Sequence, residues 1–167
     1  MKRLYLLAGV FFLLASCATP VLRKDILEQG QRNVPLVQLV RDPSSYVGKL
    51  FVLGGIIVSN KVVPDGSTIE SVYVPVDENG YLQEADVSSG RFLASYPKEK
   101  GVLDPLMYRE GRKITVAGVF IGTKPGTIGE MSYVFPVFRV EEIYLWSEYA
   151  RPSYPVTFFS FGVLFGR

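Results

Sequence analysis

The sequence contains no histidine and a single cysteine, Cys17. Without histidine, the chain lacks the commonest general base and the commonest metal ligand of proteins. A Ser-His-Asp or Cys-His catalytic site is therefore excluded, and no metal or cofactor is expected. A lone cysteine also provides neither an internal disulfide nor a CxxC motif.

The sequence also lacks a pronounced charge of either sign. It has 18 basic and 16 acidic residues, and removal of the first 16 residues, with Lys2 and Arg3, leaves 16 of each. Nucleic-acid-binding proteins normally carry a basic surplus, so no nucleic-acid partner is expected. The 151 residues that remain of 167 are enough for one domain with a hydrophobic core.

The apolar run near the N-terminus is short. Leu4 to Ser16 has no charged residue, but a comfortable membrane span needs about 20 apolar residues. The basic start, the short apolar core and the small residues that follow are typical of a secretory signal peptide, expected at residues 1–16.

The end of this run resembles a bacterial lipobox, formed by Leu14, Ala15, Ser16 and Cys17. In lipoproteins of that type the thiol receives diacylglycerol and the chain is cut before the cysteine. Two or three acyl chains give stable anchoring, which one chain does not. A plain signal peptide, an uncleaved anchor helix and a buried cysteine are the alternatives. Ala18, in place of the aspartate that retains enterobacterial lipoproteins at the inner membrane, favours the outer membrane.

Residues 17–33 are polar and charged after the cysteine, which predicts a lipidated N-terminus and tether. A folded domain is expected over 34–150. Apolar spacing predicts a short helix over 35–41, with Asn33 as a candidate N-cap. Segments rich in β-branched and aromatic residues then predict strands within 48–63, 68–76, 91–96, 113–122 and 131–146.

Five to seven short strands favour an antiparallel barrel or sandwich. The segments that begin at Gly48 and Gly111 are similar, and each carries a mid-strand glycine, Gly55 and Gly118. Such glycines usually mark a bulge or a sharp bend, and strong bending closes small barrels. The expected fold is therefore mainly β, a small antiparallel OB-like β-barrel with one short N-terminal helix.

Several stretches together resemble the Slp family of bacterial outer-membrane lipoproteins, the starvation-inducible group. They are 42–58, 91–94, 103–137 and 143–146, and the most specific part is Leu103-Asp104-Pro105 followed by Tyr108-Arg109. The resemblance implies an outer-membrane lipid anchor, a small β-barrel and no established catalytic activity. It also implies a link to stationary-phase or acid-stress physiology.

Asp104, Tyr108 and Arg109 form a candidate polar cluster. An aspartate near an arginine could bind a ligand carboxylate or phosphate. The structural alternative is that Asp104 caps one helical turn while Arg109 pairs with Asp104 or Glu110, and this alternative is favoured.

Aromatic residues could line a sugar- or peptide-binding face of such a barrel, although core packing is the favoured role. These residues are Tyr46, Tyr73, Tyr81, Phe92, Tyr96 and Tyr108. The C-terminal tail, 151–167, is apolar and aromatic, and 154–167 is expected to dock on the barrel, self-associate or contact the membrane, with disorder as the remaining alternative.

Three hypotheses of function follow. The first is an outer-membrane lipoprotein whose non-catalytic barrel faces the periplasm and contributes to envelope structure or stress adaptation. The second is a module that binds a periplasmic glycan, peptide or lipid. The third, a hydrolase that uses Asp104 and Glu110, is the weakest, because the sequence does not define a spaced acid pair beside a substrate groove.

Overall fold

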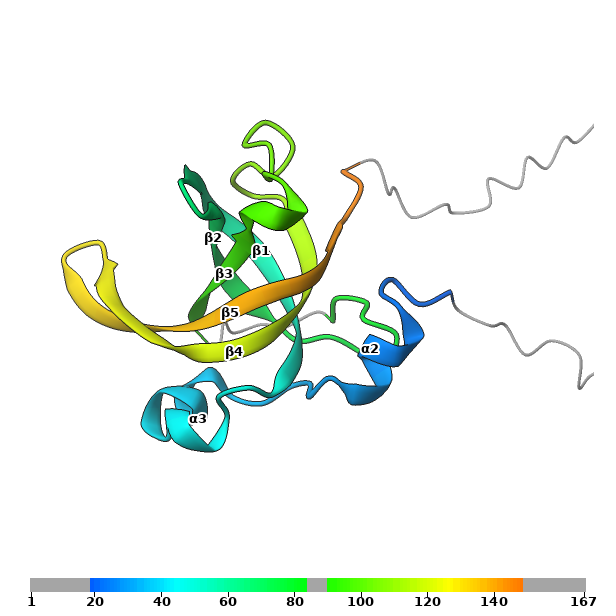
Figure 1. Ribbon diagram of the computed structural model, residues 1–167, viewed down its shortest axis with the longest axis horizontal. Helices are drawn as coiled ribbons and strands as arrows, with labels where there is room; N and C mark the ends of the chain where they lie inside the picture. The colour runs from blue at the N-terminus through cyan, green and yellow to red at the C-terminus, as the bar shows by residue number, and fades with distance from the viewer. Residues whose placement is uncertain (1–18, 84–89, 149–167) are drawn as a thin grey trace, which may run out of the picture.

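The computed structural model describes residues 19–83 and 90–148. Within them, five strands close into a barrel in the order β1-β2-β3-β5-β4 (Figure 1). The strands are β1 (Leu50–Val63), β2 (Gly66–Val74), β3 (Arg91–Pro97), β4 (Lys113–Ile128) and β5 (Met131–Leu145). The pairs are antiparallel except β3 with β5, which is parallel. The predicted mainly-β, OB-like barrel is confirmed, with one parallel pair that the sequence did not predict.

The helices of the described residues are short. They are α2 (Lys24–Gln29), α3 (Leu36–Arg41) and the 3-10 turns η2 (Pro43–Ser45) and η3 (Lys98–Lys100). α3 is the helix predicted over 35–41, and α2 is a second one. In this part of the chain, no helix has the length and apolar character needed to cross a membrane.

Asn33 does not cap α3. The helix begins after Pro35 and has no side-chain cap. The Asn33 side chain instead bonds the backbone of Val76, donating from Nδ2 to its carbonyl oxygen at 3.1 Å and accepting from its amide at 3.2 Å. Asn33 also has a φ of +56°, a left-handed conformation that asparagine tolerates better than most residues. Its amide therefore fixes the loop after β2 rather than a helix end.

Aromatic side chains fill the interior of the barrel. Phe51, Phe92, Phe120 and Phe138 are fully buried. The ring centre of Phe138 lies 5.5 Å from those of Phe51 and Phe120 and 5.8 Å from that of Phe92. These are the tilted and edge-on arrangements that aromatic pairs prefer. The interior of the barrel is therefore filled by a packed aromatic core.

A second apolar cluster lies on the outer side of the barrel. Leu22, Ile26 and Leu27 are buried against Val52 of β1 and Ala117 of β4. Successive residues of a strand point to opposite faces, so Val52 faces outward while its neighbours face the core. Figure 1 shows α2 beside the barrel. Residues 19–33 were predicted as a polar tether, but this part of the tether is docked, because its apolar side chains cover an apolar strand face.

Gly118 lies where β4 bends. The register of β4 with β5 shifts between Ala117 and Gly118. A Cβ at Gly118 would lie 2.9 Å from Cβ of Phe138. A Cβ at Gly55 would lie 2.9 Å from Cβ of Ser71, so this position is also close to its neighbouring strand. The register shift of β1 with β2 lies further along the strand, after Ile57. The two similar segments thus form the neighbouring antiparallel strands β1 and β4.

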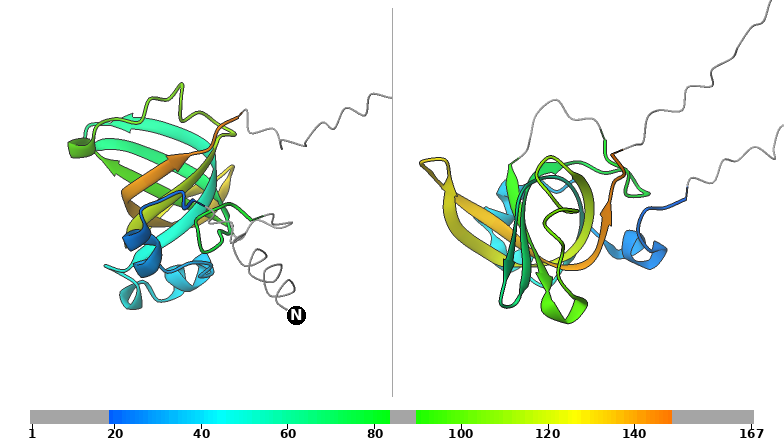
Figure 2. Two further views of the ribbon diagram at one scale, coloured as in Figure 1. Left: turned by 90° about the vertical axis from the view of Figure 1, so that its right-hand side faces the viewer. Right: turned by 90° about the horizontal axis from the view of Figure 1, so that it is seen from above.

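The β4–β5 hairpin extends beyond the barrel. Its pairing continues from Thr123 opposite Pro136 to Ile128 opposite Met131. Pro136 lies beside a register shift between Phe120 and Gly122, and a bulge is one of the few places where a strand tolerates proline. The hairpin projects on the side opposite to both α2 and the end of β5 in Figure 1 and in the right-hand view of Figure 2. The molecule thus has a hairpin end and an end where the N-terminal segment docks.

Candidate functional site

A cleft of about 520 Å³ lies at the end of the barrel where the N-terminal segment docks. Three segments far apart in sequence form its walls. The loop after β2 contributes Tyr81 and Leu82. Arg112 and Lys113 lie where β4 begins, and Trp146 and Glu148 follow the end of β5. The cleft thus combines aromatic and apolar surface with charges of both signs.

Trp146 lies at the centre of a small aromatic group. Its ring centre is 5.4 Å from that of Tyr81 and 5.0 Å from that of Tyr144. Its Nε1 donates to Oγ1 of Thr115 at 3.1 Å, and that fully buried hydroxyl donates to the carbonyl oxygen of Gly80 at 2.9 Å. The indole is therefore fixed against both β4 and the loop that carries Tyr81.

Arg112 holds the rim of the cleft together. Its guanidinium donates from Nη1 to the carbonyl oxygen of Met107 at 3.0 Å and from Nη2 to that of Trp146 at 2.8 Å. Its Nε lies 3.8 Å from Oε1 of Glu148. The side chain is largely buried, with 11% of its surface exposed. Arg112 therefore ties the loop before β4 to the end of β5.

The predicted cluster of Asp104, Tyr108 and Arg109 lies on this neighbouring loop, where the three side chains have separate partners. Oδ1 of Asp104 accepts a hydrogen bond from the backbone amide of Leu106 at 2.8 Å. The backbone carbonyl oxygen of Asp104 accepts one from the backbone amide of Tyr108 at 2.9 Å. Arg109 forms an ion pair with Glu148. Tyr108 packs partly buried on the core, and burial raises the pKa of its hydroxyl. This arrangement stabilises a turn.

The six aromatic residues considered for a binding face are also divided. Tyr73 and Phe92 are buried in the barrel core, and Tyr46, Tyr96 and Tyr108 pack partly buried against it. Tyr81 belongs to the cleft. Sequence reasoning missed its partners Tyr144 and Trp146. Their signal is the alternation in the last strand, which places residues two apart on one face.

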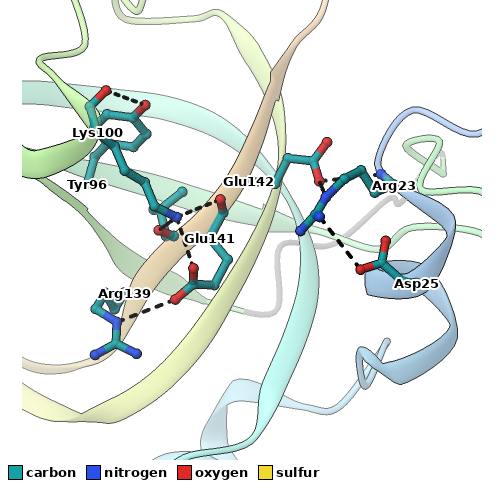
Figure 3. A network of polar contacts seen from close by, with 8 residues as sticks. Arg23, Asp25, Tyr96, Lys100, Arg139, Glu141 and Glu142 are labelled. Carbon is teal, nitrogen blue, oxygen red and sulfur yellow. Dashed lines mark hydrogen bonds and ion pairs between the residues drawn. The ribbon is translucent and has the colours of Figure 1, made fainter.

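The N-terminal segment is joined to this end of the barrel by polar contacts. The hydroxyl of Tyr81 donates to the carbonyl oxygen of Thr19 at 2.8 Å, and the amide of Val21 donates to that of Asn79 at 3.1 Å. Arg23 reaches Oε2 of Glu142 with Nε at 3.3 Å and with its backbone amide at 3.4 Å (Figure 3). The chain is thus fastened to the barrel from Thr19 onward.

The neighbour of Glu142, Glu141, joins a different segment. Lys100, at the end of η3, donates from Nζ to Oε2 of Glu141 at 2.9 Å and to its carbonyl oxygen at 2.8 Å, and Arg139 lies 3.5 Å from the other carboxylate oxygen (Figure 3). The hydrogen bond from Lys100 is the main reason that the pKa of Glu141 is lowered. The two successive carboxylates of β5 therefore hold segments on opposite sides of the strand.

Some predicted residues lie outside the part of the chain that the structure describes. These are the lipobox residues Leu14, Ala15, Ser16 and Cys17, and the tail 151–167. Within residues 19–83 and 90–148, no three acidic, cysteine or histidine side chains group together in a way that could hold a metal ion.

Comparison with known proteins identifies relatives among envelope lipoproteins. The uncharacterized lipoprotein YeaY of Escherichia coli (strain K12) is 32% identical over 143 residues, covering 84% of this chain and 71% of the relative. Outer membrane protein Slp of the same strain is 28% identical over 146 residues, covering 84% and 73%. An uncharacterized protein of Haemophilus influenzae is 31% identical over 104 residues, covering 62% and 55%.

Among solved structures, the mitochondrial single-stranded DNA binding protein Rim1 from S. cerevisiae aligns with 58% of this chain and 93% of its own, at 10% identity and a TM-score of 0.35. The family model for the outer membrane lipoprotein Slp family matches residues 14–163. Because this match spans most of the sequence, the chain belongs to the outer membrane lipoprotein Slp family.

Proposed function

We propose that acyl chains on Cys17 hold the protein at the periplasmic face of the outer membrane, where its barrel is a non-catalytic module that contributes to envelope structure or stress adaptation. The observation that carries the structural role is the packed interior, in which Phe138 lies against Phe51, Phe92 and Phe120. A packed core gives a rigid body suited to contacts through its surface.

The polar groups near the cleft support the same proposal. Asp104 caps its own turn, Arg109 pairs with Glu148, and Arg112 binds two backbone carbonyl oxygens. These contacts engage the side chains that would otherwise be candidates for acid–base work or for anion binding. Their arrangement supports a role in holding loops in place.

Replacement of Cys17 tests the anchor. Cys17→Ala should lose metabolic labelling by radioactive palmitate and leave the outer-membrane fraction, because the acceptor thiol is gone. Ala18→Asp is the matched control. It should keep the label but move to the inner-membrane fraction, following the retention signal of enterobacterial lipoproteins. Retained labelling of Cys17→Ala would refute the anchor.

Orientation and role need a cellular test. In intact cells the barrel should resist added protease, and permeabilisation of the outer membrane should expose it. A deletion strain should become more sensitive to detergent in stationary phase, and the wild-type gene, but not Cys17→Ala, should restore resistance. Digestion in intact cells would contradict the periplasmic orientation, and unchanged sensitivity would contradict the structural role.

The cleft favours a second candidate, the binding of a periplasmic glycan, peptide or lipid. Tyr81 and Trp146 provide aromatic surface, and Lys113 and Glu148 provide charges beside it. Small-ligand sites commonly combine an apolar cleft with a few polar groups. Titration with soluble peptidoglycan fragments, short peptides or monomeric lysophospholipid should then change Trp146 emission in a saturable manner. Identical emission with all three classes would exclude them as ligands.

A further inference from the structure

We propose that the barrel lies directly against the membrane surface with its cleft end, so that Tyr81, Tyr144 and Trp146 sit in the layer of phospholipid headgroups. This inference rests on the proposed lipidation of Cys17. It goes further by naming the end of the barrel that faces the bilayer and the side chains that contact the headgroups there.

Very little chain separates the anchor from the barrel. Thr19 is held by the hydroxyl of Tyr81 at 2.8 Å, and only Ala18 separates Thr19 from Cys17. Two residue steps of fully extended chain span at most about 7 Å. An acylated Cys17 therefore holds the membrane surface close to the Tyr81 side of the barrel.

The docked segment prevents the barrel from moving away. Leu22 and Leu27 are buried under the outer face of β1, and Arg23 pairs with Glu142 of β5. Detachment would expose this apolar cluster to water, at about 25 cal/mol for each Å² of apolar surface. A polar tether would allow the barrel to move freely, whereas this docked segment fixes its distance from the anchor.

The side chains at this end suit a headgroup layer. Tyrosine and tryptophan are enriched at membrane interfaces, because each combines an apolar ring with a polar group. Tyr144 is 38% exposed beside Trp146. The adjacent loop adds Leu106 and Met107, which are 82% and 54% exposed, and Arg112 joins the backbone of Met107 to that of Trp146. Aromatic and apolar groups thus gather on one end.

The same contacts predict the orientation of the whole domain. The β4–β5 hairpin projects on the side opposite to α2 and to the end of β5 (Figure 2, right). With the cleft end on the bilayer, Met131 at the hairpin turn points away from the membrane. The two ends of the barrel should therefore differ sharply in their contact with lipid.

Trp146 is the only tryptophan of the chain, so its fluorescence reports this contact directly. The experiment uses the lipidated protein in vesicles of phosphatidylethanolamine and phosphatidylglycerol, with plain or brominated acyl chains. Bromine quenches indole emission at short range. We expect a loss of Trp146 emission in brominated vesicles, and equal emission in both kinds of vesicle would overturn the proposal.

A variant that moves the reporter provides the control. Trp146→Phe combined with Met131→Trp places the only indole at the hairpin turn, where the native side chain is 77% exposed. The emission of this variant should be equal in plain and brominated vesicles. If bromine quenched the indole at the hairpin turn more strongly than it quenches Trp146, the proposed orientation would be overturned. The wild-type comparison stands even if this variant fails to fold.

Mass spectrometry of the same preparation separates the two levels of the proposal. Absence of lipid on Cys17 would refute the proposed anchor, and the orientation that rests on it would fall with it. A lipidated Cys17 with an unquenched Trp146 would leave the anchor in place and refute the membrane contact alone.

Discussion

Nε1 of Trp146 donates a hydrogen bond to Oγ1 of Thr115, which in turn donates to the carbonyl oxygen of Gly80. Thr115→Val keeps the shape of the side chain but removes its acceptor and its donor. A polar group left without a partner in a buried site costs about 1–3 kcal/mol, so the variant should be less stable by about that amount. Urea unfolding followed by circular dichroism measures the difference.

Thr123→Val is the control for that prediction, because Thr123 is exposed on the same strand. Its stability should stay within about 0.5 kcal/mol of the wild type. If both valine variants behaved alike, the hydrogen bonds of Thr115 would contribute nothing measurable.

A second prediction concerns the docked N-terminal segment. Leu27 is buried in the outer cluster, so Leu27→Ala should lower the free energy of unfolding by about 2–5 kcal/mol. Val37→Ala, at a position 51% exposed on α3, should change it by no more than about 0.5 kcal/mol. Thermal unfolding of both variants decides whether residues 19–33 belong to the folded domain. A free tether would leave the Leu27 variant as stable as the wild type.

The Lys100–Glu141 pair predicts a dependence on pH. Because the pKa of Glu141 is lowered from 4.5 by folding, the pair stabilises the protein above that value and loses its effect as the pH falls through the folded pKa. Glu141→Gln should therefore lose less stability than the wild type on acidification below about pH 5. Urea midpoints measured at several acidic pH values test this.

A matched control for the pH experiment is Glu28→Gln. The Lys24–Glu28 pair is 3.8 Å long and well exposed, so solvent screens it. This variant should follow the acid profile of the wild type. Equal profiles for Glu141→Gln and the wild type would show that Lys100 adds no pH-dependent stability.

The effect of Gly118→Ala on stability should be opposite to that of a typical glycine-to-alanine change in a strand. Where a strand has room, Gly→Ala stabilises by about 0.4–1 kcal/mol, because the unfolded chain loses freedom. At Gly118 the new Cβ would lie 2.9 Å from Cβ of Phe138 and 3.2 Å from the carbonyl oxygen of Arg139. Gly118→Ala should therefore destabilise, by about 1–3 kcal/mol. Chemical denaturation measures it, and a stabilised variant would show that the bend needs no glycine.

The sequence predicted local features of the barrel well. The β-branched and aromatic residues of 113–122 identified β4, the apolar spacing of 35–41 identified α3, and Gly118 marked a real register shift. Each of these signals depends on neighbours in the chain. Strand pairing depends on distant residues, so the parallel contact of β3 with β5 was not predicted.

The docked segment and the cleft could not be predicted for related reasons. Leu22, Ile26 and Leu27 have helical spacing, but the charged residues between them give the segment a polar composition. The cleft brings together Tyr81, Arg112 and Trp146, which meet only when β4 and β5 have paired. Asp104 and Arg109 were adjacent enough in sequence to suggest a common site, yet backbone geometry gave them different partners.

The close docking of Thr19 to Leu27 has a consequence for the timing of maturation. The peptidase that cuts a lipoprotein must reach the backbone beside the cysteine, and the carbonyl oxygen of Thr19, two residues beyond Cys17, accepts a hydrogen bond from the hydroxyl of Tyr81. We therefore expect the docking of this segment to follow the proposed processing at Cys17. The outer face of β1 would then be covered last, and an unprocessed precursor would keep Val52 and Ala117 exposed. The exposed apolar surface of such a precursor would favour its aggregation or degradation.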